Sequence, residues 1–114
     1  INVPIGRDPK QPSKFRADIN GKHAITEYNV IARNGKHDLV LLHPLTGRTH
    51  QLRVHMAHLG APIHGDRVYG KSADRLYLHA AKLEITTAPE QRKTFQSPIP
   101  AEFYELVPTD NVDI

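Results

Sequence analysis

Residues 42–70 read LHPLTGRTHQLRVHMAHLGAPIHGDRVYG, and the rest of the chain is organised around this stretch. Thr49 is a good N-cap residue, so we predict a short helix from about His50 to Leu59. Gly60 suits the left-handed position just past a helix, and a proline two residues later prevents the helix from resuming. The stretch therefore predicts a short helix followed by a loop with regularly placed glycines.

Apolar residues at helical spacing, Leu52, Met56 and Leu59, are predicted to face the core. The polar residues of this stretch then crowd the first turn of the helix; they are Arg48, His50, Gln51 and Arg53. Free backbone N–H groups and the helix dipole already favour an anion there. Arginines at a helix start are unfavourable for the helix alone, which indicates that they serve a phosphate or a carboxylate.

A hairpin is predicted before the helix. Residues His23 to Arg33 alternate as in a strand, and Asn34-Gly35 is the strongest short hairpin signal. The return strand is Lys36 to Leu45, with Leu39–Leu42 expected to be buried on both faces. Pro44 suits the last position of that strand because it cannot donate a ladder hydrogen bond.

The two ends of the chain look less regular. Residues 1–16 are predicted to be an extended basic arm, which can follow a phosphate backbone or be a frayed terminus. Leu76–Thr87 is predicted to be a strand, with a helix over Leu76–Leu83 as the competing interpretation, and Thr94–Ser97 to be a short strand. Pro100 is expected at the first position of a terminal helix, Ala101–Val107, and residues 108–114 are expected to be a flexible tail. The predicted fold class is α+β, mainly antiparallel sheet with a short helix after a hairpin and a short C-terminal helix.

Composition narrows the class of protein. The 114 residues allow one domain at most, contain no cysteine and include no apolar run long enough for a membrane span. The lack of cysteine fits a reducing cytoplasm. The net charge is +3. The N-terminal part of the chain is basic, whereas residues 76–114 are acidic and contain three Lys or Arg and six Asp or Glu. This asymmetry is consistent with a nucleic-acid partner, and an ordinary mixed surface is an equal alternative.

Three other kinds of site are poorly supported. His55 and His58 are three residues apart, and zinc-binding helices more often use a four-residue spacing with a nearby carboxylate, so no metal is expected. No serine lies in a nucleophile-elbow context, and the glycines fit no phosphate-cradling pattern. Arg53 is more informative, because a part-buried guanidinium needs a carboxylate or phosphate partner unless its stem merely covers apolar surface.

The segment Pro44–Arg53, PLTGRTHQLR, is followed by Gly65-Asp66 and Tyr69-Gly70. Together these residues closely resemble the third motif region of the RluA/RluD-type RNA pseudouridine synthases. Two further segments, Pro4–Pro9 and Leu76–Ala80, resemble family segments in the right order, as does GKHAITEY at residues 21–28. The resemblance implies part of a pseudouridine synthase catalytic domain that isomerises uridine to pseudouridine in structured RNA without a cofactor. It favours ribosomal RNA of the large subunit as the substrate, with transfer RNA as the other candidate. The target base is flipped out of the RNA.

The same resemblance assigns roles to individual residues. Arg53 corresponds to the active-site arginine that pairs with the catalytic aspartate, and Leu78, or alternatively Leu76, to the apolar residue beside the flipped base. Three rim residues are implied at the pocket: Arg48, His50 and Gln51. Arg7 and Lys10 are expected to contact RNA more weakly, and Asp66 is expected to fix its loop.

One part of the family pattern is absent. The nucleophilic aspartate lies in a His-Arg-Leu-Asp motif, and this motif does not occur in the chain. We therefore expect the chain to be the C-terminal portion of the catalytic domain, with the N-terminal half of the same protein as its partner, and to be inactive alone. The alternative is an RNA-binding module that uses the same scaffold without chemistry.

Overall fold

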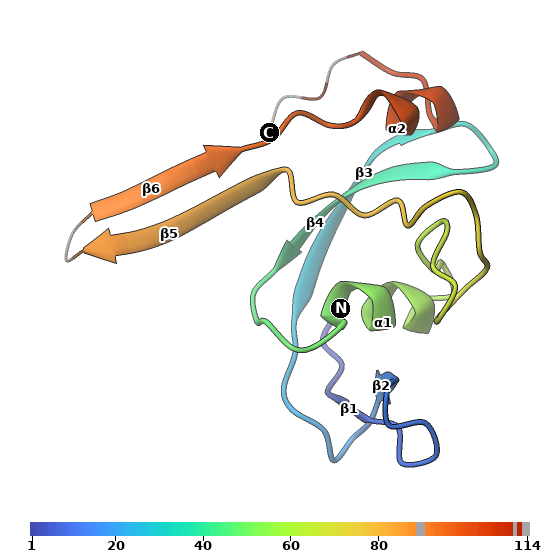
Figure 1. Cartoon of the computed structure of the whole chain (residues 1–114), viewed down its shortest axis with the longest axis vertical. Coiled ribbons are helices and arrows are strands. Elements are labelled where there is room, and N and C mark those ends of the chain that lie inside the picture. Colours follow the sequence, from blue (N-terminus) through green and yellow to red (C-terminus); the bar gives the residue numbers. More distant parts are fainter. Residues whose placement is uncertain (89–90, 111, 113–114) are drawn as a thin grey trace. The chain divides into compact units, whose positions relative to one another are not determined.

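The computed structural model describes residues 1–88, 91–110 and 112 (Figure 1). They form two units: residues 1–30 with 40–77, and residues 31–39 with 78–114. Within the described residues the fold is α+β, with three two-stranded sheets and two short helices, as predicted from the sequence. In chain order the elements are β1 (Ile5–Arg7), β2 (Phe15–Ala17), β3 (Thr26–Arg33), β4 (Asp38–Pro44), α1 (Gln51–His58), β5 (Lys82–Ala88), β6 (Gln91–Gln96) and α2 (Ala101–Leu106).

The first residues form a small sheet where we expected an open arm. Strands β1 and β2 pair antiparallel, with Ile5 opposite Ala17 and Arg7 opposite Phe15. Ile5 is buried at 3% exposure and packs with Ala24 and Val54, so it anchors this segment in the core of the first unit. Pro4 falls before β1, and Pro9 and Pro12 fall in the connection between the two strands, where no ladder bond is needed.

The hairpin of β3 and β4 forms around Asn34-Gly35 as predicted. The side-chain oxygen of Asn34 accepts hydrogen bonds from the backbone N–H groups of Lys36 and His37, at 3.0 and 2.8 Å. Gly35 has a φ of 87°, which glycine adopts without the steric cost that a side chain brings. Strand β4 ends at Pro44. The expected burial of Leu39–Leu42 on both faces is wrong, because none of the four is buried.

Helix α1 begins one residue later than predicted. Its N-cap is His50, with a left-handed φ of 56°, and not Thr49. The C-terminal end is as predicted: Gly60 has a φ of 85° and its N–H bonds to the carbonyl of Ala57, while the N–H of Ala61 bonds to Met56. This pair of bonds is a Schellman motif.

The buried face of α1 also differs from the prediction. Gln51, Val54, His55 and Met56 are buried, whereas Leu59 is 45% exposed and Leu52 is half-buried. Two polar residues therefore occupy the face that we expected to be apolar. This is possible because both are fully hydrogen-bonded, as described below.

The second unit contains β5, β6 and α2. Residues 76–81 form neither strand nor helix, so β5 begins at Lys82 and not at Leu76, and the competing helix is also wrong. Strand β6 includes the predicted Thr94–Ser97 segment up to Gln96 and begins earlier. Pro100 is the N-cap of α2 and not its first residue, and Val107 is buried at 3% exposure just after the helix. Residues 111 and 113–114 of the expected tail lie outside the described residues.

Candidate functional site

Arg53 and Asp66 form an ion pair within the first unit. Nε and Nη2 of Arg53 donate to the two carboxylate oxygens of Asp66, at 3.0 and 2.9 Å. The side chain of Arg53 is 19% exposed and that of Asp66 is fully buried. A bidentate pair of this kind is among the stronger hydrogen-bonded contacts in proteins. The sequence predicted a part-buried Arg53 with an anionic partner, and the structure provides one within the chain.

Asp66 also holds the loop that carries it. One of its oxygens accepts hydrogen bonds from the backbone N–H groups of Val68 and Tyr69, each at 3.1 Å. Burial by itself would raise the pKa of Asp66, but the hydrogen bonds from Arg53 and from these N–H groups outweigh it and lower the pKa. Asp66 is therefore a charged, loop-fixing residue, as expected from the sequence.

The loop that carries Asp66 can turn at Gly65 because glycine has no Cβ. Its φ is 82°, and a Cβ placed there would lie 1.6 Å from the carbonyl oxygen of Arg75. The backbone on either side of Leu76 therefore packs directly against the loop that contains Asp66. A parallel bridge between Gly65 and Ser72 and a hydrogen bond from the N–H of Tyr77 to the carbonyl of His64 fix the same contact.

Tyr69 joins the ion pair to the start of α1. The guanidinium of Arg53 lies over its ring, 5.2 Å from the centroid. The hydroxyl of Tyr69 accepts a hydrogen bond from the N–H of Phe15 at 2.9 Å and is 2.8 Å from Nδ1 of His50. The rings of Phe15 and Tyr69 both contact His50 edge-on. Together they hold His50 in the left-handed conformation that begins the helix.

The charge state of His50 follows from these neighbours. Burial lowers the pKa of His50 most, and the positive charge of Arg53 lowers it further. The negative charge of Asp66 raises it by a smaller amount. A neutral imidazole can accept a hydrogen bond at Nδ1 from the hydroxyl of Tyr69, which itself accepts from the N–H of Phe15. His50 therefore adds no competing positive charge beside Arg53.

One edge of the Arg53 guanidinium remains open. Its Nε/Nη2 edge is taken by Asp66, and Nη1 has no hydrogen-bond partner among the described residues. A guanidinium offers five N–H donors in a fixed plane, so the Nη1 side can still bind a second carboxylate or a phosphate. The arrangement can thus hold one anion permanently and present a preoriented positive charge to another.

Gln51 lies in a different environment from the rim position that we expected. It is 4% exposed and its oxygen accepts from the hydroxyl of Thr46 at 2.7 Å and from the N–H of Arg48 at 3.0 Å. Its amide nitrogen donates to the carbonyl of Ile25 and to the hydroxyl oxygen of Thr26, at 2.9 and 3.0 Å. Every hydrogen-bonding group of Gln51 is used inside the protein, so it supports the loop before α1 and is not exposed to a ligand.

The same network continues to His55, which is fully buried. Its Nε2 is 2.8 Å from the carbonyl of Val3 and its Nδ1 is 2.8 Å from the hydroxyl of Thr26. A carbonyl accepts only, so Nε2 carries the proton and Nδ1 accepts from Thr26. Burial lowers the pKa of His55, which keeps this neutral form. His55 is thus a satisfied structural histidine.

The remaining predicted residues lie at several places. Arg48 is half-buried, and its Nε donates to the carbonyl of His23 at 2.7 Å. Arg7 and Arg48 line one open pocket of the first unit, whereas Lys10 is exposed and lies outside its lining. Leu76 is half-buried in the first unit, next to the Asp66 loop, and Leu78 is half-buried and belongs to the second unit.

Two kinds of feature do not occur among the residues that the structure describes. They contain no cluster of three or more His, Cys, Asp or Glu side chains that could hold a metal ion. None of their helices has the length and apolar character that crossing a membrane requires.

Tyr69 and Thr26 are the site residues that sequence reasoning missed. Tyr69 follows Asp66 by three residues, the spacing at which a carboxylate can accept from the backbone of its own turn, so the turn could have been found. The contact of Tyr69 with Phe15 spans 54 residues and that of Thr26 with His55 spans 29. No local pattern indicates contacts at such separations.

Comparison with known proteins identifies the family of the chain. The family model described as RNA pseudouridylate synthase matches residues 1–58. An uncharacterised RNA pseudouridine synthase of Zymomonas mobilis is 44% identical over 113 residues, which cover 93% of this chain and 52% of that protein. Ribosomal large subunit pseudouridine synthase D of Borreliella burgdorferi is 44% identical over 105 residues, covering 87% of this chain and 32% of the relative.

A solved structure is also similar. Human RNA pseudouridylate synthase domain containing 1 superposes with a TM-score of 0.75 at 32% identity, over 86% of this chain and 46% of that one. The chain spans about half the length, or less, of these relatives. The matched segment contains the first strands, the hairpin and helix α1 with Arg53. The chain therefore belongs to the RNA pseudouridylate synthase family, of the RluA/RluD type.

Proposed function

We propose that the full-length protein is an RNA pseudouridine synthase that isomerises uridine to pseudouridine in structured RNA. In this proposal Arg53 is the active-site arginine, and its open edge pairs with a nucleophilic aspartate from a segment outside this chain. The observation that carries the proposal is the incomplete hydrogen bonding of the Arg53 guanidinium. Asp66 occupies one edge, and Nη1 has no partner among the described residues.

The chemistry explains why such an arginine is needed. The nucleophilic carboxylate must be ionised to attack, and a guanidinium at contact distance lowers a carboxylate's pKa by roughly 1–3 units. Asp66 and Tyr69 hold Arg53 in place before the second carboxylate arrives, so little side-chain entropy is lost when the new pair forms. Covalent attack by that carboxylate then divides one difficult isomerisation into two easier steps.

We further propose ribosomal RNA of the large subunit as the substrate and the cytoplasm as the location. Relatives from Borreliella burgdorferi and Pseudomonas aeruginosa are both named ribosomal large subunit pseudouridine synthase D. A relative from Vibrio cholerae is named a dual-specificity RNA pseudouridine synthase. We propose transfer RNA as the second candidate substrate. Leu76, next to the Asp66 loop, and Leu78 are the candidates for the apolar wall beside the flipped uracil.

The test uses the full-length protein and RNA labelled with tritium at C5 of uridine. Reattachment of the base through C5 displaces that hydrogen, so tritium release measures the reaction. We expect release with the wild type and a loss of about 100-fold or more with Arg53→Ala, as for removal of a key charge-stabilising group. Arg67→Ala is the matched control, because Arg67 is an exposed arginine that directly follows Asp66 in the same loop. No tritium release by the wild type on any structured RNA would overturn the proposal.

The 114-residue chain alone should release no tritium, because it lacks the proposed nucleophile. If the full-length protein binds RNA but never isomerises uridine, the alternative of a non-catalytic RNA-binding module replaces the synthase.

A further inference from the structure

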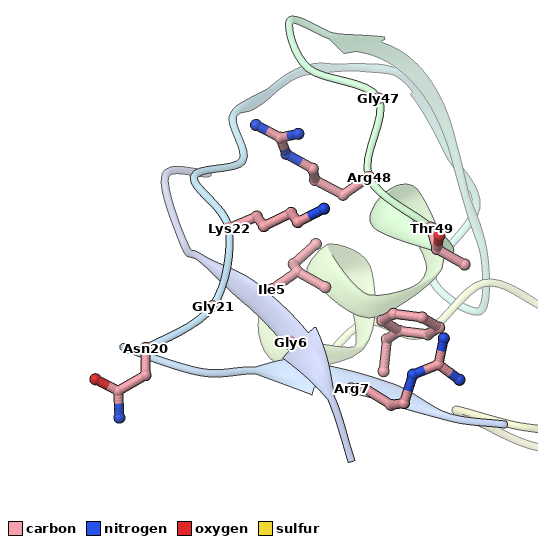
Figure 2. Close-up of a pocket in the computed structure, with 10 residues that line it drawn as sticks. Ile5, Gly6, Arg7, Asn20, Gly21, Lys22, Gly47, Arg48 and Thr49 are labelled. Atoms are coloured by element: carbon pink, nitrogen blue, oxygen red, sulfur yellow. The ribbon is translucent and has the colours of Figure 1, made fainter. Parts of the chain in front are cut away.

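A second polar site lies in the first unit, at an open pocket of about 480 Å³. Three short segments line it, residues 5–7, 20–22 and 47–49, together with Phe15 (Figure 2). Its volume lies within the usual range for small-ligand pockets, about 300–1,000 Å³. The ion pair of Arg53 and Asp66 is not part of this lining.

The charged side chains that line the pocket are all positive. Each of the three segments contributes one cation, Arg7, Lys22 and Arg48, and no acidic residue lines the pocket. The nearby Asp18 lies beside Gly6, but one of its oxygens accepts from the N–H of Asn20 and the other lies 4.0 Å from Arg16. Like charges repel, so three cations gathered without a carboxylate favour binding of an anion.

The two arginines are already fixed by other contacts. Arg48 donates from Nε to the carbonyl of His23 at 2.7 Å, which leaves its terminal nitrogens for a ligand. Arg7 donates to the carbonyl of Pro12 and lies 4.9 Å from the centre of the Phe15 ring. Both guanidinium groups are therefore held at the pocket with donors to spare.

Lys22 differs from both arginines. Its side chain reaches across the pocket towards the segment that carries Arg48 (Figure 2), and its ammonium has no ion pair or hydrogen bond with any described residue. Its backbone is fixed, because its N–H and C=O both bond to Ile5, at 2.8 and 2.9 Å. A lysine with a fixed backbone and a free ammonium is suited to contact a phosphate as a point charge.

We propose that this pocket binds a backbone phosphate of the RNA substrate, with Lys22 as its main electrostatic contact and Arg7 and Arg48 at its sides. The inference rests on the proposed function for the identity of the ligand and adds a binding site outside the Arg53 centre. Phosphate contacts fix the position and register of an RNA without reading its sequence. Lys22 should therefore influence how the RNA is held and not the chemical step.

The test compares Lys22→Ala with Lys71→Ala in the full-length protein. Lys71 is an exposed lysine of the same unit that does not line the pocket, so both variants lose the same charge. RNA affinity is measured by fluorescence anisotropy over a series of salt concentrations. For Lys22→Ala we expect an affinity loss of about fivefold or more and a salt slope reduced by about one. Lys71→Ala should match the wild type, and the kcat of Lys22→Ala at saturating RNA should be preserved.

Three results would overturn the inference. They are an unchanged affinity and slope for Lys22→Ala, an equal loss for Lys71→Ala, and a fall in melting temperature of the RNA-free Lys22→Ala protein, which would indicate a carboxylate partner elsewhere in the protein. Failure of the proposed function is distinguishable from all three. If the protein depends on Lys22 to bind RNA but does not isomerise uridine, the proposed phosphate site stands and the proposed synthase activity is contradicted.

Discussion

The two polar regions on α1 differ in how completely their hydrogen bonds are used. Around Gln51 and His55, every side-chain donor and acceptor has a partner inside the first unit. Around Arg53, one edge of the guanidinium is held by Asp66 and the other has no partner among the described residues. The closed region stabilises the helix, and the open region is where an additional anion can bind. Burial alone does not separate the two, because Asp66 is as deeply buried as His55.

The largest stability effect should come from the closed region. Gln51→Ala removes four hydrogen bonds at once and leaves the N–H of Arg48 and the O–H of Thr46 without their acceptor. We expect a loss of about 3 kcal/mol in the free energy of unfolding, since each buried unsatisfied group costs about 1–3 kcal/mol. Urea unfolding measures it. A loss below about 0.5 kcal/mol would show that this network does not hold α1.

Asp66→Asn should affect both stability and activity. The amide keeps the shape of the side chain but removes the charge and one of the two acceptors that bind Arg53. We expect a loss of about 1–3 kcal/mol in the free energy of unfolding and a lower turnover number in the full-length protein, because Arg53 is no longer fixed. Asp38→Asn is the control, since Asp38 is 48% exposed and 4.0 Å from Arg33. Equal effects of the two substitutions would contradict the positioning role of Asp66.

Acid should weaken the fold first through two histidines, His50 and His55. The pKa values of His55, His50 and Asp66 are all lowered in the folded protein, so the unfolded chain binds more protons at intermediate pH. Stability is therefore full above the ordinary histidine pKa of about 6.5 and falls as the pH drops below it, with Asp66 adding a further loss below about pH 4. Melting temperatures from pH 8 to pH 4 measure this. His55→Gln should flatten the fall between pH 6.5 and pH 5, and an unaltered profile would exclude His55 as a cause.

The smallest effect should come from the β5–β6 hairpin of the second unit. Glu84 is 44% exposed and lies 3.1 Å from Arg92 and 3.6 Å from Lys82, so solvent screens both pairs. We expect Glu84→Gln to change the free energy of unfolding by less than about 0.5 kcal/mol. A loss comparable to that of Gln51→Ala would mean that surface ion pairs contribute more to this fold than its buried network.

Local chemistry explains what could be predicted from the sequence. The turn at Asn34-Gly35, the end of β4 at Pro44 and the left-handed Gly60 depend on residues within a few positions, and all three are confirmed. Arg53 was also predicted to be part-buried with an anion. These features need no knowledge of distant segments.

The features that could not be predicted depend on distant contacts. Gln51 and His55 look like exposed polar residues until Thr26 and Val3 are brought beside them. His50 replaces Thr49 as N-cap because Tyr69 and Phe15 hold its ring. Leu39–Leu42 read as a strand buried on both faces, yet β4 lies in a two-stranded sheet and Leu41 is 37% exposed.

The central claim is that Arg53 uses a planar guanidinium to hold two anions at once, Asp66 within this chain and a nucleophilic carboxylate from outside it. The most direct measurement is tritium release from C5-labelled uridine in RNA by full-length Arg53→Lys, with RNA affinity measured in parallel. An ammonium keeps the charge but lacks the two-edged fork, so we predict a turnover at least about 100-fold below the wild type, with RNA affinity within about threefold, a difference of less than 1 kcal/mol. Turnover near the wild-type value would contradict the claim.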